Sequence, residues 1–246
     1  MVDVGGKTMT LHCYGSGNPV VVLESGLGAG WNNWANIIDG IKRELRVCAY
    51  ERSYLSKSSQ QFVEDLHVLL ANAGLKGPFI LVGHSYGGMN VILYAHQYPQ
   101  EVAGIVLEDI LEPGYAARYL AALPPETPND SPDLKELRRG WSTPRRNARG
   151  VDITASSEQS QAVESLGNIP LIVLTALTPF PEWGDIPEQV KARLDETRQA
   201  MQRELTRLST NSKQIMSSTN EHAIHLFVPQ EVVDAIMELV QMRRGQ

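Results

Sequence analysis

The sequence has few cysteines and no excess of positive charge. Its 246 residues include two cysteines, and 22 lysines and arginines stand against 28 aspartates and glutamates, giving a net charge of −6. Cys13 and Cys48 are not in CxxC spacing and no histidine–cysteine cluster accompanies them, so we expect no zinc site. Because phosphate recognition depends on clustered positive charge, the acidic balance argues against a nucleic-acid partner.

Long apolar runs and cofactor motifs are also missing. No segment approaches the roughly 18 apolar residues of a membrane-spanning helix, so we expect no membrane span. Residues 1–6 show neither the basic nor the apolar region of a secretory signal, which favours a cytoplasmic location for the chain as given. No phosphate-binding glycine loop with Lys-Ser/Thr and no HExxH helix is present, and we expect no cofactor and no metal.

Short apolar runs rich in β-branched residues alternate with helical patterns along the chain. This alternation predicts an α/β protein, with a mostly parallel twisted sheet flanked by helices in one domain of residues 1–246. The expected strands are 9–14, 20–24, 46–50, 79–83, 103–108, 171–175 and 213–217. The expected helices are 31–45, 59–73, 86–97, 187–208 and 230–242, with a capping box from Ser58 to Gln61 and Pro229 at a helix start.

Residues 110–168 interrupt the alternation. The segment is rich in proline, arginine and serine, and its clearest helical piece is 115–123. We expect it to form a small lid inserted over one end of the sheet. Aromatic residues in and near it either line an apolar acyl pocket or pack the lid: Tyr115, Tyr119, Trp141, Phe180 and Trp183.

The strongest chemical motif lies between the expected strand 79–83 and the helix 86–97. It reads Gly83-His84-Ser85-Tyr86-Gly87, a G-x-S-x-G sequence. A sharp strand-to-helix turn strains the central residue and exposes its side chain, and small flanking residues prevent collisions. The positive end of the following helix favours an oxyanion, with the Tyr86 N–H as the first donor. The motif predicts Ser85 as a nucleophile.

A serine nucleophile needs a histidine base and an acid that orients it. Four of the six histidines lie on expected elements or beside the serine, which leaves His222 and His225 in the loop before the last helix. With this motif and this loop, the chain resembles the α/β-hydrolase superfamily, as a serine esterase or lipase-like member, over nearly its whole length. The superfamily's order of nucleophile, acid and histidine implies His222 as the base, with His225 as the alternative.

The resemblance also implies the remaining site residues. The acid follows one of two strands, which implies Asp109, with Asp185 and Glu108 as alternatives. A second oxyanion donor, beside Tyr86, comes from the turn after an early strand, where the Leu27 N–H is the candidate.

The chain departs from the superfamily's usual pattern at two places. It has Ser25-Gly26 where many relatives carry His-Gly, which leaves backbone donation intact but changes the bonds that hold the loop. It has Glu51-Arg52 where relatives often have Asp-Arg and a longer glycine-containing loop, which alters or shortens one pocket wall.

The two cysteines fall on strands that the superfamily's sheet order makes neighbours. They are either a disulfide or two buried thiols. A Cys13–Cys48 bond would indicate an oxidising compartment, secreted or periplasmic, and a leader that has been removed.

These features predict a carboxylesterase-like serine hydrolase (EC 3.1.1 type). It would cleave small-molecule esters with small or medium acyl chains through an acyl-enzyme. Superfamily members that dehalogenate or open epoxides usually carry aspartate at the elbow, so Ser85 argues against both reactions. Acyl transfer, lactone or thioester hydrolysis and lyase chemistry are the alternatives, together with a non-catalytic hydrolase-fold binding protein. The sequence specifies no oligomeric state.

Overall fold

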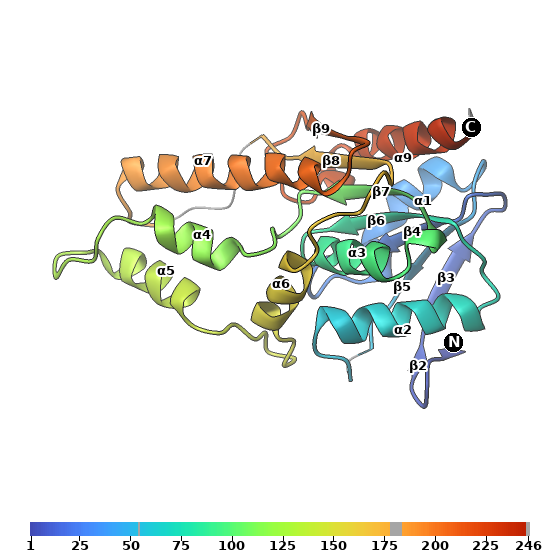
Figure 1. The fold of residues 1–246 in the computed structure, drawn as a ribbon, viewed down its shortest axis with the longest axis horizontal. Coiled ribbons are helices and arrows are strands. Elements are labelled where there is room, and N and C mark those ends of the chain that lie inside the picture. The colour runs from blue at the N-terminus through green and yellow to red at the C-terminus, as the bar shows by residue number, and fades with distance from the viewer. Residues whose placement is uncertain (54, 178–183, 245–246) are drawn as a thin grey trace.

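A computed structural model describes residues 1–53, 55–177 and 184–244. Its centre is a seven-stranded sheet in the order β3-β5-β4-β6-β7-β8-β9 (Figure 1). β3 is antiparallel to β5, and every other neighbouring pair is parallel, so the predicted mostly parallel sheet is confirmed. The strands are β3 (Leu11–Tyr14), β4 (Val21–Glu24), β5 (Val47–Tyr50), β6 (Phe79–His84), β7 (Val102–Glu108), β8 (Leu171–Thr175) and β9 (Ser212–Met216).

The predicted strand 9–14 is two strands. Its first residue belongs to a separate hairpin of β1 (Val2–Asp3) and β2 (Thr8–Met9), and the main sheet begins only at Leu11. Cys13 and Cys48 lie directly opposite each other on β3 and β5 and form a disulfide. The disulfide therefore ties the antiparallel edge strand to its neighbour, while Cys13 itself is exposed and Cys48 is buried.

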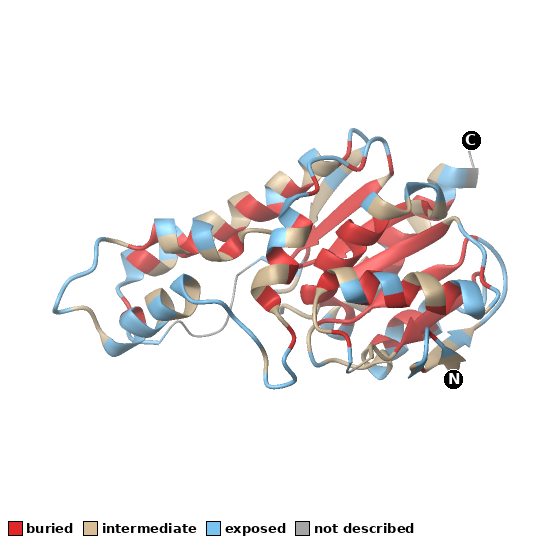
Figure 2. Ribbon diagram, turned by 60° about the horizontal axis from the view of Figure 1, so that its bottom comes forward, coloured by how far each residue is buried: buried red, intermediate tan, exposed pale blue. Residues whose placement is uncertain are grey.

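Helices cover both faces of the sheet because successive strand side chains point to opposite sides. Val21 and Leu23 pack in the same core as α1 (Ala35–Ile41) and α9 (Pro229–Arg244), whereas Val22 packs in the core with α2 (Ser59–Asn72) and α3 (Tyr86–Gln97). The central strands are buried on both faces, as Figure 2 shows, which explains their uninterrupted apolar sequences.

The start of α2 differs from the prediction. Ser58 occupies the N-cap position, but its side chain makes no capping bond, and the Gln61 side chain accepts from the Lys57 N–H at 2.6 Å. The first N–H groups of α2 donate instead to Ser156 Oγ and Gln159 Oε1 of α6 (Ile153–Gln161), at 3.0 and 2.9 Å. A neighbouring helix thus replaces the capping box. Pro229 does begin α9, as predicted.

Residues 110–168 hold three helices, of which the first matches the predicted piece 115–123: α4 (Tyr115–Ala122), α5 (Pro132–Ser142) and α6. α4 and α5 pack with α7 (Glu188–Glu204) around an apolar cluster of their own and extend beyond the sheet (Figure 1). We call α4, α5 and α7 the cap. Tyr119 is buried there and stacks on Trp141, with ring centroids 5.0 Å apart, while Tyr115 packs in the same cluster. These aromatic residues therefore pack the cap.

Phe180 and Trp183 lie outside the described residues. The predicted helix 187–208 is α7 followed by a short 3-10 turn, η3 (Leu205–Leu208). Within the described part of the chain, no helix is long and apolar enough to cross a membrane.

Candidate active site

Ser85 lies at the turn between β6 and α3 with φ 53° and ψ −125°, a conformation that non-glycine residues rarely adopt. Neighbouring backbone approaches so closely that the flanking glycines cannot carry a side chain. A Cβ on Gly87 would lie 2.5 Å from the Glu24 carbonyl oxygen, and one on Gly83 would lie 2.8 Å from the Gly88 Cα. The strained turn therefore has the geometry expected of a nucleophile elbow.

Asp109 and His222 come together although they are 113 residues apart in the sequence. His222 Nδ1 lies 2.7 Å from Asp109 Oδ2, and the Ala176 N–H donates to Oδ1 at 3.0 Å. Asp109 is buried, whereas the His222 side chain is 41% exposed. Burial alone would raise the pKa of Asp109, but the His222 hydrogen bond and the Arg198 charge hold that pKa below its ordinary value. The carboxylate can thus orient an imidazole that remains accessible.

The alternative acid Glu108 and the alternative base His225 bond to each other. Glu108 Oε1 accepts from the backbone N–H of His225 at 2.8 Å and lies 2.6 Å from His225 Nδ1. Both side chains are almost fully buried, and the indole of Trp34 stacks on the His225 ring at a centroid distance of 4.3 Å. This second acid–histidine pair is enclosed in the core, so it anchors the histidine loop and does not face solvent.

The third alternative, Asp185, is exposed next to the cap. Its backbone N–H donates to Asp133 Oδ2 of α5 at 2.6 Å. His222 is bonded to Asp109 instead, because the end of β7 lies beside the loop that carries His222.

His84 supports the histidine loop from the residue next to Ser85. Burial lowers its pKa from 6.5 to about 4, so the ring is neutral at ordinary pH. Its Nε2 lies 3.1 Å from the His222 carbonyl oxygen, which can only accept, so Nε2 carries the proton. The elbow and the loop of His222 are thereby joined directly.

His84, Glu108 and His225 also form a group of possible metal ligands, with donor atoms within 4.8 Å of one another. His225 Nδ1 and His84 Nε2 already make the hydrogen bonds given above. A metal would displace the bonds that hold the histidine loop, and the group fits a structural network better than a metal site.

The loop after β4, which carries the predicted oxyanion donor Leu27, is held by buried ionic contacts. Arg52 Nη1 bonds Glu24 Oε1 and the carbonyl oxygen of Ser25, and Nη2 donates to the carbonyl oxygen of Gly26. Asn90 of α3 donates to Glu24 Oε1 at 2.7 Å. Arg52, which follows the Glu51 departure noted in the sequence, therefore holds this loop.

The contacts of Ser25 and Gly26 show why the departure from His-Gly is compatible with the fold. Ser25 Oγ accepts from Trp34 Nε1 at 2.9 Å and donates to the Gly30 carbonyl oxygen at 3.3 Å. A Cβ on Gly26 would lie 2.9 Å from His84 Nδ1 and 3.3 Å from Ser85 Cβ, so the loop passes directly against the elbow.

The two predicted oxyanion donors belong to residues whose side chains point into packed clusters. Tyr86 is the first residue of α3, and its hydroxyl makes a 2.8 Å hydrogen bond with Ser156 Oγ. Leu27 is partly buried against both the cap cluster and the cluster around Phe62. In each case the side chain serves packing, and only the backbone N–H is assigned to the chemistry.

Several residues near the site were missed in the sequence: Glu24, Asn90, Glu112, Arg198 and Gln202. Glu24 and Asn90 are polar residues within otherwise apolar segments of β4 and α3, a signal that was present in the sequence. Arg198 is one of several arginines on the highly charged helix α7, and nothing in the local sequence distinguishes it.

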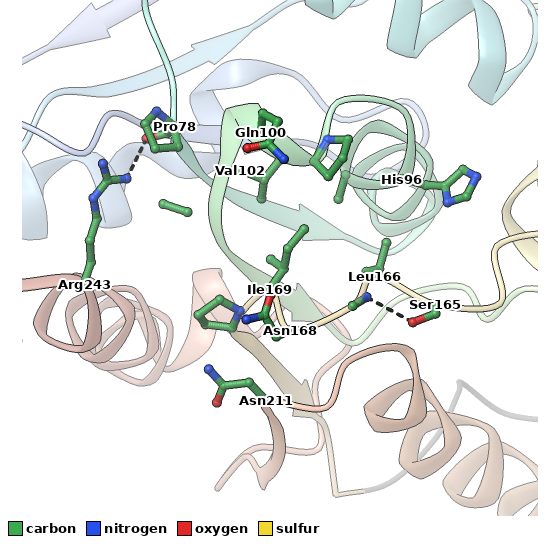
Figure 3. Close-up of a pocket in the computed structure, with 15 residues that line it drawn as sticks. Pro78, His96, Gln100, Val102, Ser165, Leu166, Asn168, Ile169, Asn211 and Arg243 are labelled. Carbon is green, nitrogen blue, oxygen red and sulfur yellow. Dashed lines mark hydrogen bonds between the residues drawn. The ribbon is translucent and has the colours of Figure 1, made fainter. Parts of the chain in front are cut away.

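Two of the cavities in the structure differ in size and in their distance from the candidate site. A cavity of about 760 Å³ lies at the edge of the sheet opposite the site, where residues such as Pro78, Asn168 and Asn211 precede the strands (Figure 3). None of the predicted site residues lines it. A much smaller cavity, about 40 Å³, is lined by Leu27 together with Arg52 and Phe62, and so adjoins the predicted oxyanion loop.

Comparison with known proteins agrees with this fold. Residues 19–139 match the family described as "alpha/beta hydrolase fold". The chain is 27% identical over 239 residues to the uncharacterized protein YqjL of Bacillus subtilis, covering 94% of this chain and 87% of YqjL. It is 32% identical over 119 residues to the 2-hydroxy-6-oxo-2,4-heptadienoate hydrolase of Pseudomonas putida, covering 44% and 42% of the two chains.

Among solved structures, a thermophilic esterase from Thermogutta terrifontis superposes with a TM-score of 0.63 at 18% identity. The match covers 95% of this chain and 93% of the esterase. At this identity the likeness shows a shared fold.

Proposed function

Because the chain belongs to the α/β-hydrolase superfamily, we propose that it is a serine hydrolase that cleaves carboxylic esters through an acyl-enzyme. The observation that carries the proposal is the strained Ser85 at the elbow, adjacent to a residue that bonds the loop of His222. His222 is in turn hydrogen-bonded to the buried Asp109. These contacts support a nucleophile, a base and an orienting acid that act together.

In the proposed reaction, His222 Nε2 removes the proton of the Ser85 hydroxyl, because Nδ1 is engaged with Asp109. Ser85 Oγ attacks the ester carbonyl carbon, and the resulting oxyanion accepts hydrogen bonds from the Leu27 and Tyr86 N–H groups. Collapse breaks the bond to the alcohol, which leaves with the proton from His222. Water then attacks the acyl-enzyme with His222 as base, releasing the acid and restoring Ser85.

Two observations support small or medium acyl groups on an ester as the substrate class. The aromatic residues Tyr115, Tyr119 and Trp141 are used to pack the cap. The superposed protein from Thermogutta terrifontis is an esterase. Serine at the elbow matches covalent acyl chemistry, in which the serine oxygen carries the acyl group between the two half-reactions.

A series of p-nitrophenyl esters of increasing acyl length tests the proposal. We expect the native protein to cleave the short esters best and Ser85→Ala to lose at least about 10³-fold in kcat. Ser165→Ala is the matched control, because Ser165 is exposed and lines the distant cavity. Absence of turnover by the native protein across the series, or equal turnover by Ser85→Ala, would refute ester hydrolysis at Ser85.

A further inference from the structure

Arg198 of the cap helix α7 is buried against the acid of the proposed triad. Its side chain is 2% exposed, and Nη2 donates to Asp109 Oδ1. The other carboxylate oxygen of Asp109 bonds His222 Nδ1 at 2.7 Å. A buried arginine is costly to desolvate unless it is paired, so this ion pair is a fixed feature of the folded protein.

The same helix clamps the chain that follows Asp109. Gln202, one turn beyond Arg198, donates through Nε2 to the Ile110 carbonyl oxygen at 2.8 Å and to Glu112 Oε1 at 2.9 Å. Burial raises the pKa of Glu112 from 4.5 to about 7, so this carboxyl is protonated in mildly acidic solution. The positive charge of Arg198 is then balanced by the Asp109 carboxylate, and the protonated Glu112 does not compete for it.

We propose that Arg198 is a positioning residue that sets both the orientation and the proton affinity of the Asp109–His222 pair, an inference that rests on the proposed function. With Oδ1 occupied by Arg198 and by the Ala176 N–H, only Oδ2 of the carboxylate is directed at the imidazole. The cap thereby contributes to the catalytic geometry through α7.

The charge of Arg198 acts on the same pair. A guanidinium beside Asp109 offsets the negative charge that would otherwise stabilise a protonated His222. The pair therefore takes up a proton less readily than it would without Arg198. The other ionisable groups that face this cluster come from five elements: His84 at the end of β6, Glu108 and Glu112 at and after the end of β7, Tyr119 on α4, Asp195 on α7 and His225 on α8 (Ile224–Phe227).

The pH–rate profile of Arg198→Met separates this role from a merely structural one. The acid limb of kcat/KM should move to higher pH by about one unit, the lower end of the effect of a neighbouring charge. The plateau kcat should fall by about tenfold through looser orientation, with a smaller change in KM. Arg198→Lys keeps the charge and should restore most of the native acid limb. Arg203→Met, an exposed arginine on the same helix, is the matched control.

A second readout keeps this inference distinct from the proposed function. The imidazole resonances of His222, assigned with His222→Gln, are titrated by NMR in the native protein and in folded Arg198→Met without substrate. The midpoint should move up by about one pH unit in the variant. An unchanged midpoint and acid limb, or a downward shift, would overturn the role of Arg198. A native protein that cleaves no ester would overturn the proposed function and leave the NMR test intact.

Discussion

Glu108 and Asp109 are consecutive residues at the end of β7, yet they bind two different histidines of one loop. Glu108 binds His225 in the core, and Asp109 binds His222 at the accessible surface of the site. Asp109 has φ 40°, a conformation uncommon outside glycine, asparagine and aspartate. One tight bend thus supplies an anchoring pair and a pair suited to catalysis.

The first prediction compares Asp109 with Asp185, the two candidate acids that follow different strands. Asp109→Asn should lower kcat by about 10⁴-fold, the scale seen for the orienting aspartate of a serine protease, because the amide cannot stabilise a protonated imidazole. Asp185→Asn should leave kcat nearly unchanged, since Asp185 is exposed and joined to α5. Ester hydrolysis under saturating substrate measures both. Small and equal losses would exclude Asp109 as the acid.

The second prediction separates the two histidines. His222→Ala should reduce kcat by at least about 10³-fold with little change in thermal stability, because its side chain is partly exposed. His225→Ala should keep measurable turnover but lower the free energy of unfolding by about 2 to 4 kcal/mol, since it leaves Glu108 buried without its partner. Urea unfolding and ester hydrolysis on both variants decide the matter. The reverse pattern would make His225 the base.

The third prediction concerns the loop of Leu27. Arg52→Met should destabilise the protein by about 3 to 5 kcal/mol, because the buried Glu24 loses its ion-pair partner. Adding Glu24→Gln should recover much of that stability. The double variant should still lose about 10²-fold in kcat, because no arginine holds the carbonyl groups of Ser25 and Gly26 in the oxyanion loop. Full activity in the folded double variant would show that Arg52 has no part in the site.

The fourth prediction uses Glu112. Its pKa in the folded protein is about 7 against an ordinary 4.5, so folding favours the protonated form. The stability that this preference contributes is fully present below about pH 4.5 and is lost as the pH rises through about 7. Glu112→Gln should remove this loss and be more stable than the native protein at pH 8, by on the order of 3 kcal/mol. Urea unfolding at pH 5 and pH 8 gives the free energy of unfolding of the native protein and of Glu112→Gln. An equal change between the two pH values in both proteins would contradict the prediction.

Much of the fold could be predicted because the buried strands have continuous apolar sequences. Strand β8 and helix α3 begin and end at the predicted residues. Helix α6 could not be predicted from local pattern, since it is rich in serine and glutamine and lacks an apolar stripe. It is held by tertiary contacts, in which Ser156 and Gln159 accept hydrogen bonds from the start of α2.

The residues of the candidate site also divide into those that the sequence could predict and those that it could not. Ser85, His222 and Asp109 lie in motifs with fixed places relative to strands, and the sequence therefore indicated them. Arg198 lies on α7 among other arginines, and which of them turns inward depends on how the cap packs over the end of β7. Such a contact depends on tertiary packing, which local sequence patterns do not encode.

Covalent labelling of Ser85 tests the central claim most directly. A fluorophosphonate probe should modify the native protein on one peptide that contains Ser85, and Ser85→Ala should remain unmodified. Labelling of His222→Ala should be slower, because the serine has lost its base. Intact-mass and peptide mass spectrometry give both results. A native protein that cleaves esters but is not labelled, or is labelled at another residue, would contradict Ser85 as the nucleophile.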